Sequence, residues 1–436
     1  MSTTGTTGLG VGIVWWPPLD ALCQEREGLV DVIEAEPEAY WVPASDAPGF
    51  RSFLAGALVH LPQPKLLHGV GAPLGGTCAP PDGHTAALAA EVAALGPEHV
   101  SEHLSFTRFQ TPGGKSAISA GFMLPPLQSP AGVALAAANV RLHREALGGI
   151  PLAVETPVSY LPPIPGEWPD GGFVAAVSEA ADCGILLDLH NVLCNARNGR
   201  QSVWAFCDEL PLERVWELHF AGGEREGGFY VDAHSGLAER ELMDIAAALI
   251  PKLPQLRAII FEIMPERVAD VGLGAIGRQL GQLRDLWNTR ACDCQHCPTS
   301  SAAWSGTEMP LDPESWSTLL GSAATGLPLP VLDDELIPWW DSTASALELY
   351  RMLVRENRAS TVAAVAPRTT RLLLMQHGGA ATRRLLAEFW QQSTQAYTAV
   401  DEARAFIRFL VAAHPTLPGV ADAAALDIAK LADLGI

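Results

Sequence analysis

Short apolar runs alternate with alanine- and leucine-rich stretches over most of the first 287 residues of the chain. Runs such as ILLDL and AIIFEI are apolar at nearly every position, which is typical of strands buried on both faces in a parallel sheet. We therefore predict eight strands: Val11–Trp16, Val30–Ala35, Lys65–Val70, His99–Phe106, Ile150–Thr156, Cys183–Asn191, Arg214–Gly222 and Arg257–Met264.

The stretches between these runs have the composition of helices. The predicted helices are Thr85–Leu95, Ala131–Ala146, Gly172–Ala181, Gln201–Glu209, Leu237–Ile250 and Arg267–Trp287. Eight buried strands with helices between them over about 280 residues are typical of a (β/α)8 TIM barrel, an α/β fold. An open doubly wound sheet would carry a glycine-rich turn after its first strand, where this chain has Trp15, Trp16, Pro17 and Pro18. We expect the barrel to span residues 11–287.

The pattern changes beyond the barrel. Residues 288–310 are rich in Cys, Ser and Thr and have no periodicity, so we interpret them as a linker. The CDCQHC segment there, with Cys292, Cys294 and Cys297, could bind a metal or carry incidental thiols. Residues 311–436 show no strand-like run, and Thr382–His414 reads as one long amphipathic helix. We predict a smaller, mainly helical domain there, and a flexible tail over residues 1–10.

The composition of the chain argues against some classes of binding partner. The chain of 436 residues has 28 basic and 49 acidic side chains, for a net charge of −21. This excess of negative charge argues against binding to nucleic acid or to an anionic membrane surface. Eight cysteines are too few for a disulfide scaffold, and no signal peptide or membrane span is evident. We expect a cytoplasmic protein.

Polar residues of the metal-binding types recur at the carboxyl ends of the predicted strands. In a TIM barrel these ends meet at one mouth, where functional residues lie. Along the chain they are Glu34, Glu36, Glu38, His68, Glu102, His103, Glu155, Asp188, His190, Asn191, His219, Asp232, His234 and Glu262.

This set predicts metal ions. Several carboxylates gathered in one mouth cannot all stay ionised unless cations lie between them. Neutral imidazole binds metal but does not neutralise carboxylates, so the interleaved histidines favour metal over protonation. Oxygen and imidazole ligands suit Fe, Mn or Zn, and the number of ligands suggests two or three ions. Asp232 and His234 would point to one side of an extended segment and could chelate one ion together.

Seven short motifs, in this order, resemble a known family. They are LLHGVG, SEHLSF, VETPVSYL, GILLDLHNV, ELHFAGG, VDAHSG and IIFEIMP, within about residues 10–285. The family is that of the multinuclear non-haem iron-dependent oxidases, TIM-barrel enzymes that modify ribosomally made peptides, of which the methanobactin biosynthesis oxidase is the best-known member. The resemblance implies that His68, His103, Glu155, Asp188, Asn191, His219, Asp232, His234 and Glu262 are its metal-site and catalytic residues.

The resemblance also implies cofactors and partners. Members hold two or three irons, mixed ferrous and ferric, and use O2 to oxidise a peptide, usually at cysteine; many need a partner protein that captures the peptide's leader. This chain departs from the family pattern at Thr156, where Asn is common, at Gly223, where a second His is common, and at Met264, where Asp is frequent.

We therefore expect an O2-dependent iron oxidase that acts on a cysteine-containing precursor peptide, with a helical domain that binds the peptide or docks a leader-binding partner. The alternative is a divalent-metal barrel of the sugar-isomerase or endonuclease-IV type, which also places histidines and carboxylates at strand ends. Such an isomerase would be colourless and indifferent to O2. A non-catalytic binding protein with structural metals is a third reading, and it would leave no open coordination position.

Overall fold

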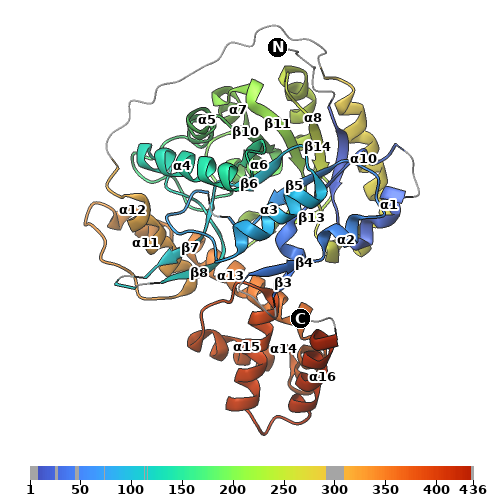
Figure 1. The fold of residues 1–436 in the computed structure, drawn as a ribbon. Helices are drawn as coiled ribbons and strands as arrows, with labels where there is room; N and C mark the ends of the chain where they lie inside the picture. The colour runs from blue at the N-terminus through green and yellow to red at the C-terminus, as the bar shows by residue number, and fades with distance from the viewer. Residues whose placement is uncertain are drawn as a thin grey trace.

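The fold is shown by a computed structural model (Figure 1). It describes residues 8–24, 28–44, 49–72, 74–111, 113–114, 116–290 and 309–433. Most of the predicted tail and linker, including the CDCQHC segment, lies outside the described residues.

Eight parallel strands close into a barrel, which confirms the predicted fold class. Each barrel strand pairs with the barrel strands before and after it along the chain, and the last pairs with the first. The strands are β1 (Gly10–Val14), β2 (Val32–Ala35), β5 (Lys65–Gly69), β6 (Val100–His103), β9 (Leu152–Glu155), β10 (Gly184–Asp188), β11 (Val215–Phe220) and β14 (Ala258–Phe261).

Helices surround the barrel and bury its outer face. The apolar side chains of the strands and of the inner helix faces form one large core, as the near-continuous apolar runs predict. The longer helices are α3 (His84–Leu95), α4 (Pro130–Ala146), α5 (Asp170–Ala181), α6 (Leu189–Arg197), α7 (Val203–Glu209), α8 (Arg240–Leu249) and α10 (Leu273–Trp287). Shorter helices are α1 (Asp20–Gln24), α2 (Leu54–Leu58) and α9 (Val268–Val271).

Three two-stranded hairpins follow barrel strands, and the sequence analysis did not predict them. They pair β3 (Trp41–Pro43) with β4 (Phe50–Ser52), β7 (Phe106–Gln110) with β8 (Ala117–Leu124), and β12 (Gly222–Glu226) with β13 (Phe229–Gly236). Their strands give little periodic signal, because burial does not alternate from residue to residue along the longer ones, β8 and β13.

Several predicted boundaries were wrong for identifiable reasons. The strand predicted to run to Asn191 ends at Asp188, because the Asp188 side chain accepts the Asn191 backbone N–H and starts α6. The helix predicted over Arg267–Trp287 is divided by Gly272, whose φ is +81°.

The region after the barrel consists, in its described part, of helices and the loops that join them. It contains α11 (Pro313–Thr325), α12 (Ile337–Ser342), α13 (Ala344–Val365), α14 (Pro367–Gln392), α15 (Ala399–Ala413) and α16 (Val420–Asp433). The single helix predicted over Thr382–His414 is instead the end of α14 and all of α15. The chain leaves the helix after Gln392, and the Thr398 side chain caps the next one by accepting the Asp401 N–H.

Helices α11 to α13 share a hydrophobic core with the β7–β8 hairpin. Trp316 of α11 and Tyr350 of α13 are buried with Phe106 and Phe109 of β7. The Trp316 indole Nε1 donates to the Pro125 carbonyl at 2.9 Å, which ties α11 to the segment after β8. The first half of the helical region is therefore packed against the hairpin and the loops that follow the barrel strands.

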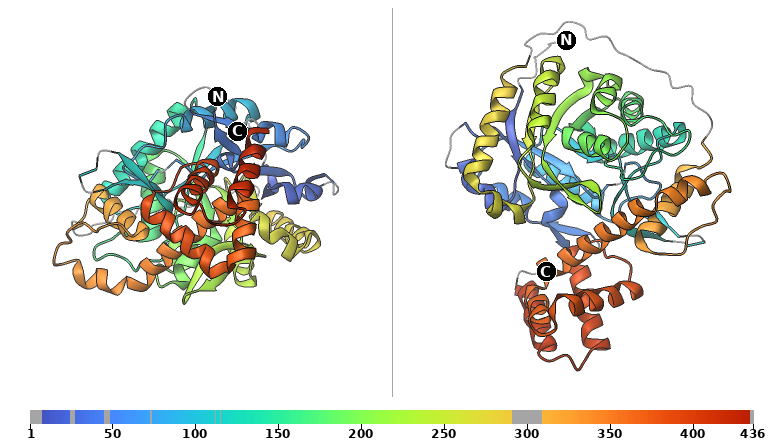
Figure 2. Two further views of the ribbon diagram at one scale, coloured as in Figure 1. Left: turned by 90° about the horizontal axis from the view of Figure 1, so that it is seen from below. Right: turned by 180° about the vertical axis from the view of Figure 1, so that it is seen from behind.

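Helices α14 to α16 form a lobe that projects from the same end of the barrel as β3, β4, β7 and β8 (Figures 1 and 2). That end follows the carboxyl ends of β2 and β6, so the lobe lies on the side of the barrel mouth. Phe389, Phe406 and Leu410 make a small core of its own. Within the described residues, no helix is both long and apolar enough to cross a membrane.

Candidate metal centre

The barrel brings the predicted ligands to one mouth. His68 and His103 lie at the ends of β5 and β6, Glu155 and Asp188 end β9 and β10, His219 lies near the end of β11, and Glu262 directly follows β14. Asp232 and His234 are contributed by β13, and Asn191 by the first turn of α6. The register aligns His103 with Glu155 and Asp188 with His219 across neighbouring strands.

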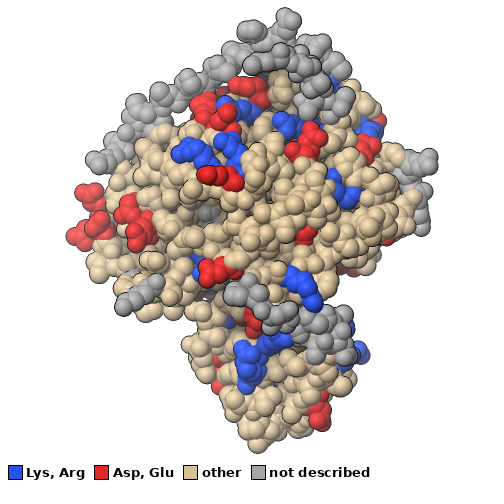
Figure 3. All heavy atoms as spheres, viewed as in Figure 1, with Lys and Arg blue, Asp and Glu red and all other residues tan. Residues whose placement is uncertain are grey.

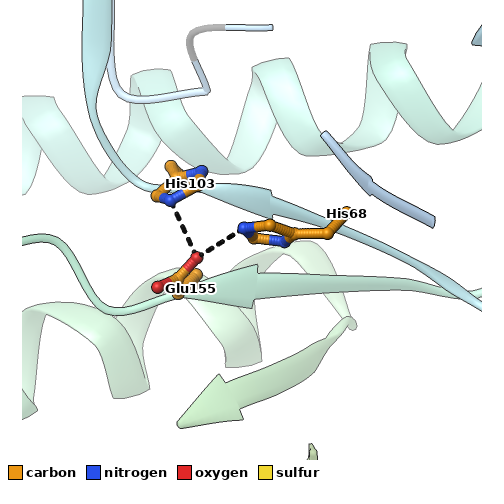
Figure 4. A group of neighbouring side chains, drawn as sticks. All are labelled: His68, His103 and Glu155. Atoms are coloured by element: carbon orange, nitrogen blue, oxygen red, sulfur yellow. Dashed lines mark ion pairs between the residues drawn. The ribbon is translucent and has the colours of Figure 1, made fainter. Parts of the chain in front are cut away.

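Two histidines converge on one carboxylate at one side of the mouth. The Nε2 atoms of His68 and His103 lie 3.1 and 2.9 Å from the same atom, Glu155 Oε2. Figure 4 shows both rings directed at that oxygen. The other nitrogen of each ring contacts an oxygen of the protein: His68 Nδ1 lies 2.8 Å from the Ser101 hydroxyl and His103 Nδ1 3.2 Å from the Gly69 carbonyl. Such second contacts orient imidazoles for metal binding.

Further groups of ligand atoms continue from this one. Glu155, Asp188 and His219 form a second group, and Asp188, His234 and Glu262 a third; within each group the ligand atoms lie within 4.8 Å of one another. Glu155 belongs to the first two groups and Asp188 to the last two. The described residues thus offer a row of adjacent positions linked by shared carboxylates, as a site for two or three ions requires.

The unpaired atoms of these side chains fit metal ions. Asp188 Oδ2 and Asn191 Oδ1 are buried and accept no hydrogen bond from any described residue, whereas Glu155 Oε2 is paired with the His68 and His103 nitrogens. His234 Nε2 and Asp232 Oδ1 form an ion pair at 2.8 Å. Buried polar atoms left unpaired cost free energy, so their convergence on shared points indicates that cations complete the site.

Asn191 orients the central carboxylates. Its backbone N–H donates to Asp188 Oδ1 at 2.9 Å, and its side-chain Nδ2 donates to Glu155 Oε1 at 2.9 Å. The second oxygen of each carboxylate is left facing the candidate ion positions. Asn191 therefore acts on the ligands whether or not its own Oδ1 binds an ion.

The ligand side chains of the site differ in how their surroundings shift their pKa values. Burial, then the negative charges of Glu155 and Asp232, raises the pKa of Asp188 to about 7. Burial alone would raise the pKa of Glu155 too, but the nearby His103 and His68 imidazoles outweigh it and hold that pKa well below its usual range. Burial lowers the pKa of His68. The negative charges of Glu155 and Glu34 raise it by more, so that the pKa is about 9. Without metal, the imidazoles beside Glu155 outweigh its burial, whereas His219 and His234 do not outweigh the burial of Asp188 and the negative charges next to it.

We therefore expect metal-free Asp188→Asn to be more stable than metal-free wild type at pH 8. An acid whose pKa rises from 3.8 to about 7 on folding destabilises the fold when ionised, so the penalty is absent below pH 3.8, grows up to pH 7 and is full above it. The gain should be on the order of 1–3 kcal/mol at pH 8 and shrink toward pH 4. Thermal unfolding of chelator-treated proteins at several pH values measures it, with the exposed Asp208→Asn as control. A variant less stable than wild type at pH 8 would contradict this account.

Not every polar residue at a strand end joins the row. Glu38 pairs with His84 at 2.9 Å, away from the ligand groups, and Glu102 accepts the Ala72 and His103 backbone N–H groups. Glu36 is held close enough to Glu262 that burial and this neighbouring charge raise the pKa of Glu36 to about 7.

Sequence reasoning named Glu34 and His219 but missed Glu217 and His99, which complete a buried layer of polar residues below the mouth. Glu34 Oε2 lies 2.7 Å from His219 Nε2, and Glu217 Oε1 lies 3.8 Å from the same nitrogen; these three form a fourth group of ligand atoms. Glu217 also contacts His99 Nε2 at 2.8 Å. The alternation within VWELHF, which puts Glu217 and His219 on one side of the strand, was the available signal.

The helical region reaches this site through two tyrosines. The Tyr350 hydroxyl of α13 accepts the Tyr160 backbone N–H at 3.1 Å, and the Tyr160 hydroxyl accepts the Asp232 backbone N–H at 3.2 Å. These contacts connect a helix outside the barrel to a ligand at its mouth.

The row opens to solvent at two places. Side chains of His103, His234 and Asp232 are 11, 14 and 22% exposed, whereas that of His219 is fully buried. His234 also has a φ of +44°, a left-handed conformation that costs a non-glycine residue free energy and often marks functional sites. On the face drawn in Figure 3, acidic and basic side chains are interspersed among the described residues, with no continuous basic area.

Comparison with known proteins places the chain among relatives from several bacteria. It is 31% identical over 301 residues, 65% of this chain, to a UPF0276 protein of Streptomyces avermitilis, and the aligned part covers only 56% of that relative. A UPF0276 protein of Anaeromyxobacter sp. is 28% identical over 52% of this chain and 80% of its own length.

Solved structures show the fold alone. Endonuclease IV from Thermus thermophilus aligns with a TM-score of 0.38 and 18% identity, over 63% of this chain and 99% of that one. D-Psicose 3-epimerase from Clostridium cellulolyticum aligns with a TM-score of 0.41 and 9% identity, over 65% of this chain and 100% of that one. Likenesses this distant carry no argument about activity.

Residues 9–266 match the family described as RiPP precursor modification enzyme MbnB/TglH/ChrH, where a RiPP is a ribosomally made, modified peptide. The match includes every strand of the barrel, from β1 to β14, and every predicted ligand. The chain therefore belongs to the MbnB/TglH/ChrH family of RiPP precursor modification enzymes.

Proposed function

We propose that this chain is an O2-dependent oxidase that uses two or three iron ions to modify a cysteine-containing precursor peptide. The observation that carries the proposal is the row of ligand groups linked by Glu155 and Asp188, at the mouth of a barrel that belongs to a peptide-modifying family. The family supports a peptide substrate. The donor set supports the metal.

Iron suits the donors better than the hard cations do. The row mixes imidazole nitrogens with carboxylate oxygens and, among the described residues, contains no thiolate ligand. Such sites favour Fe, Mn or Zn over Mg or Ca. Bound iron would supply the electron transfer between a peptide thiolate and O2, which neither Zn nor Mg can do.

Different residues of the chain would bind the ions, orient the ligands and face the peptide. Glu155 and Asp188 would hold adjacent ions together, and Asn191 would keep both carboxylates in place through the hydrogen bonds described above. His68 and His103 would bind from one side through Nε2, while His234 and Glu262 would bind from the other. The partly exposed His103, His234 and Asp232 would face the incoming peptide.

We also propose that residues 311–436 position the peptide or a leader-binding partner. Their location on the side of the barrel mouth supports this role. A cavity of about 250 Å³ lies between β8, α13 and the end of α14, and the Ile118–Gly121 segment, Arg358, Trp390 and Gln395 line part of it. The mixture of backbone amides, an arginine and an indole is suited to an extended peptide.

Iron content and oxygen dependence test the proposed activity. Protein expressed with iron should retain two or three irons per chain by elemental analysis. It should also change the mass of a cysteine-containing precursor peptide only when O2 is present. A peptide with its cysteines replaced by serine is the control. At most one transition-metal ion per chain, or a mass change that is equal without O2, would rule the oxidase out.

A further inference from the structure

Glu34 lies below the ligand row and contacts a histidine of that row across the barrel. It belongs to β2 and His219 to β11, and these two strands are not neighbours in the barrel, so the side chains meet in its interior. Both are fully buried, and Glu34 Oε2 lies 2.7 Å from His219 Nε2. The ligand set that the family resemblance implies includes His219 but leaves Glu34 without a role.

The second oxygen of Glu34 reaches another histidine of the row through a hydroxyl group. The buried Ser101 hydroxyl donates to Glu34 Oε1 at 3.4 Å, and the same Ser101 oxygen lies 2.8 Å from His68 Nδ1. The register places His68 beside Ser101 on the neighbouring strands β5 and β6. One carboxylate is thus connected to a histidine of the first ligand group and to a histidine of the second.

These contacts determine which nitrogen of each ring faces the row. Ser101 occupies His68 Nδ1, so His68 Nε2 is the nitrogen that reaches Glu155 Oε2, 3.1 Å away. Glu34 occupies His219 Nε2, so His219 Nδ1 is the nitrogen that lies beside Glu262 Oε2, at 3.2 Å. An imidazole that binds metal through one nitrogen is usually held at the other by an oxygen of the protein, which fixes the orientation of the ring.

We propose that Glu34 is a positioning residue of the metal centre, which orients His219 by direct contact and His68 through Ser101. This inference rests on the proposed function, because it requires that ions occupy the row. It assigns Nδ1 of His219 and Nε2 of His68 as the nitrogens that bind the ions. Because the two histidines belong to ligand groups that share Glu155, one side chain outside the row sets the direction of ligands in both groups.

A further ion between Glu34, Glu217 and His219 is the competing interpretation, since their ligand atoms lie within 4.8 Å of one another. Two features favour positioning instead. His219 is also a member of the second ligand group, and one imidazole can bind two ions only after it has lost both ring protons. Glu217 is the more distant carboxylate, with Oε1 3.8 Å from His219 Nε2, and its Oε2 is already held by His99 at 2.8 Å.

Metal titration of the full-length chain tests the inference, with Co(II) as a spectroscopic probe added to chelator-treated protein without O2. Wild type should bind two or three Co(II). Glu34→Leu should bind the same number, with at least one ion weakened about 30-fold and a changed visible spectrum, because the rings lose their fixed orientation. Ser101→Ala should weaken one ion by a smaller factor, since it acts on His68 alone.

Two further variants separate positioning from a general effect on the fold. Glu34→Gln keeps the length of the side chain and an acceptor oxygen, so its affinity should stay within about fivefold of wild type, the cost of exchanging a charged for a neutral hydrogen bond. Glu91→Leu replaces a buried glutamate of α3 outside the ligand groups and should titrate like wild type.

The outcomes separate this inference from the proposed function. Wild type that binds at most one Co(II) would refute the multi-ion site and this inference with it. Wild type that binds two or three, with Glu34→Leu and Ser101→Ala unchanged in affinity and spectrum, would refute only the role of Glu34. If Glu34→Leu and Glu34→Gln each bind one ion fewer, Glu34 is a ligand and the positioning role is wrong.

A shorter carboxylate keeps the test decisive if Glu34→Leu fails to fold. Glu34→Asp retains the charge but withdraws the carboxylate from His219, so it should weaken the same ion. Unchanged Co(II) binding in a folded Glu34→Asp protein would overturn the proposal.

Discussion

Glu155→Ala should lose at least one metal ion per chain and reduce peptide modification by more than about 100-fold. Glu155 is the residue shared by the first two ligand groups, and both His68 and His103 converge on its Oε2. Removal of this carboxylate takes a ligand from two adjacent positions at once. Elemental analysis and a peptide mass assay measure the two effects, and Glu145→Ala, at an exposed position of α4, is the matched control.

The metal-free Glu155→Ala protein should also be less stable than metal-free wild type, by about 3 kcal/mol, because it leaves two buried imidazoles without their counter-charge. This is the opposite of the effect expected for Asp188→Asn, and the contrast separates the two carboxylates. Full metal content in Glu155→Ala would show that Glu155 is not a ligand. Equal destabilisation by both substitutions would show that the carboxylates have the same electrostatic role.

Trp316→Ala should destabilise the whole molecule by about 3–5 kcal/mol, the usual cost of a buried aromatic truncation. Trp316 is 2% exposed, packs beside Trp339 and donates to the Pro125 carbonyl. Its loss would open a cavity in the core that joins α11 to the β7–β8 hairpin. Chemical unfolding, followed by far-UV circular dichroism, measures the change; Trp204→Ala, at a 44% exposed position, should cost less than about 1 kcal/mol.

The same substitution tests whether the helical region is detachable. If α11 to α13 were an independent domain, Trp316→Ala would unfold the helices and leave the barrel transition unchanged. We expect one shifted transition for both, because the two parts share a core. Some loss of metal affinity should accompany it, since Tyr350 supports Tyr160, and Tyr160 in turn holds the Asp232 backbone.

The shared core also determines how the helical region should be studied. The linker predicted from the sequence suggests that a truncation near residue 290 would give the barrel without the helical region of the same chain. In the structure such a cut would expose Phe106, Phe109 and Leu124, which are fully buried. Point substitutions in the cavity near Arg358 are the better probe of peptide binding, and because Arg358 pairs with the buried Glu402 at 2.8 Å, Gln395 is the safer first target.

The sequence by itself determined the barrel and the residues at its mouth. Eight apolar runs predicted eight parallel strands, since strands buried on both faces need apolar side chains at nearly every position. The carboxyl ends of such strands must meet, so residues as distant in sequence as His68 and Glu262 could be assigned to one site from their positions at strand ends alone. The extended VDAHS segment likewise placed Asp232 and His234 together, as β13 does.

Only the tertiary structure decided which of these residues are neighbours and which other side chains hold them in place. Carboxylates look alike in a sequence, yet Glu155 is paired with two imidazoles, while for Asp188 burial and the carboxylates of Glu155 and Asp232 outweigh the nearby histidines. The barrel's stagger sets which side chains are neighbours. The support of Asp232 depends on Tyr160 and on Tyr350, the latter 118 positions further along the chain. Contacts of this kind leave no periodic signal, since they arise where separate elements meet rather than within one element.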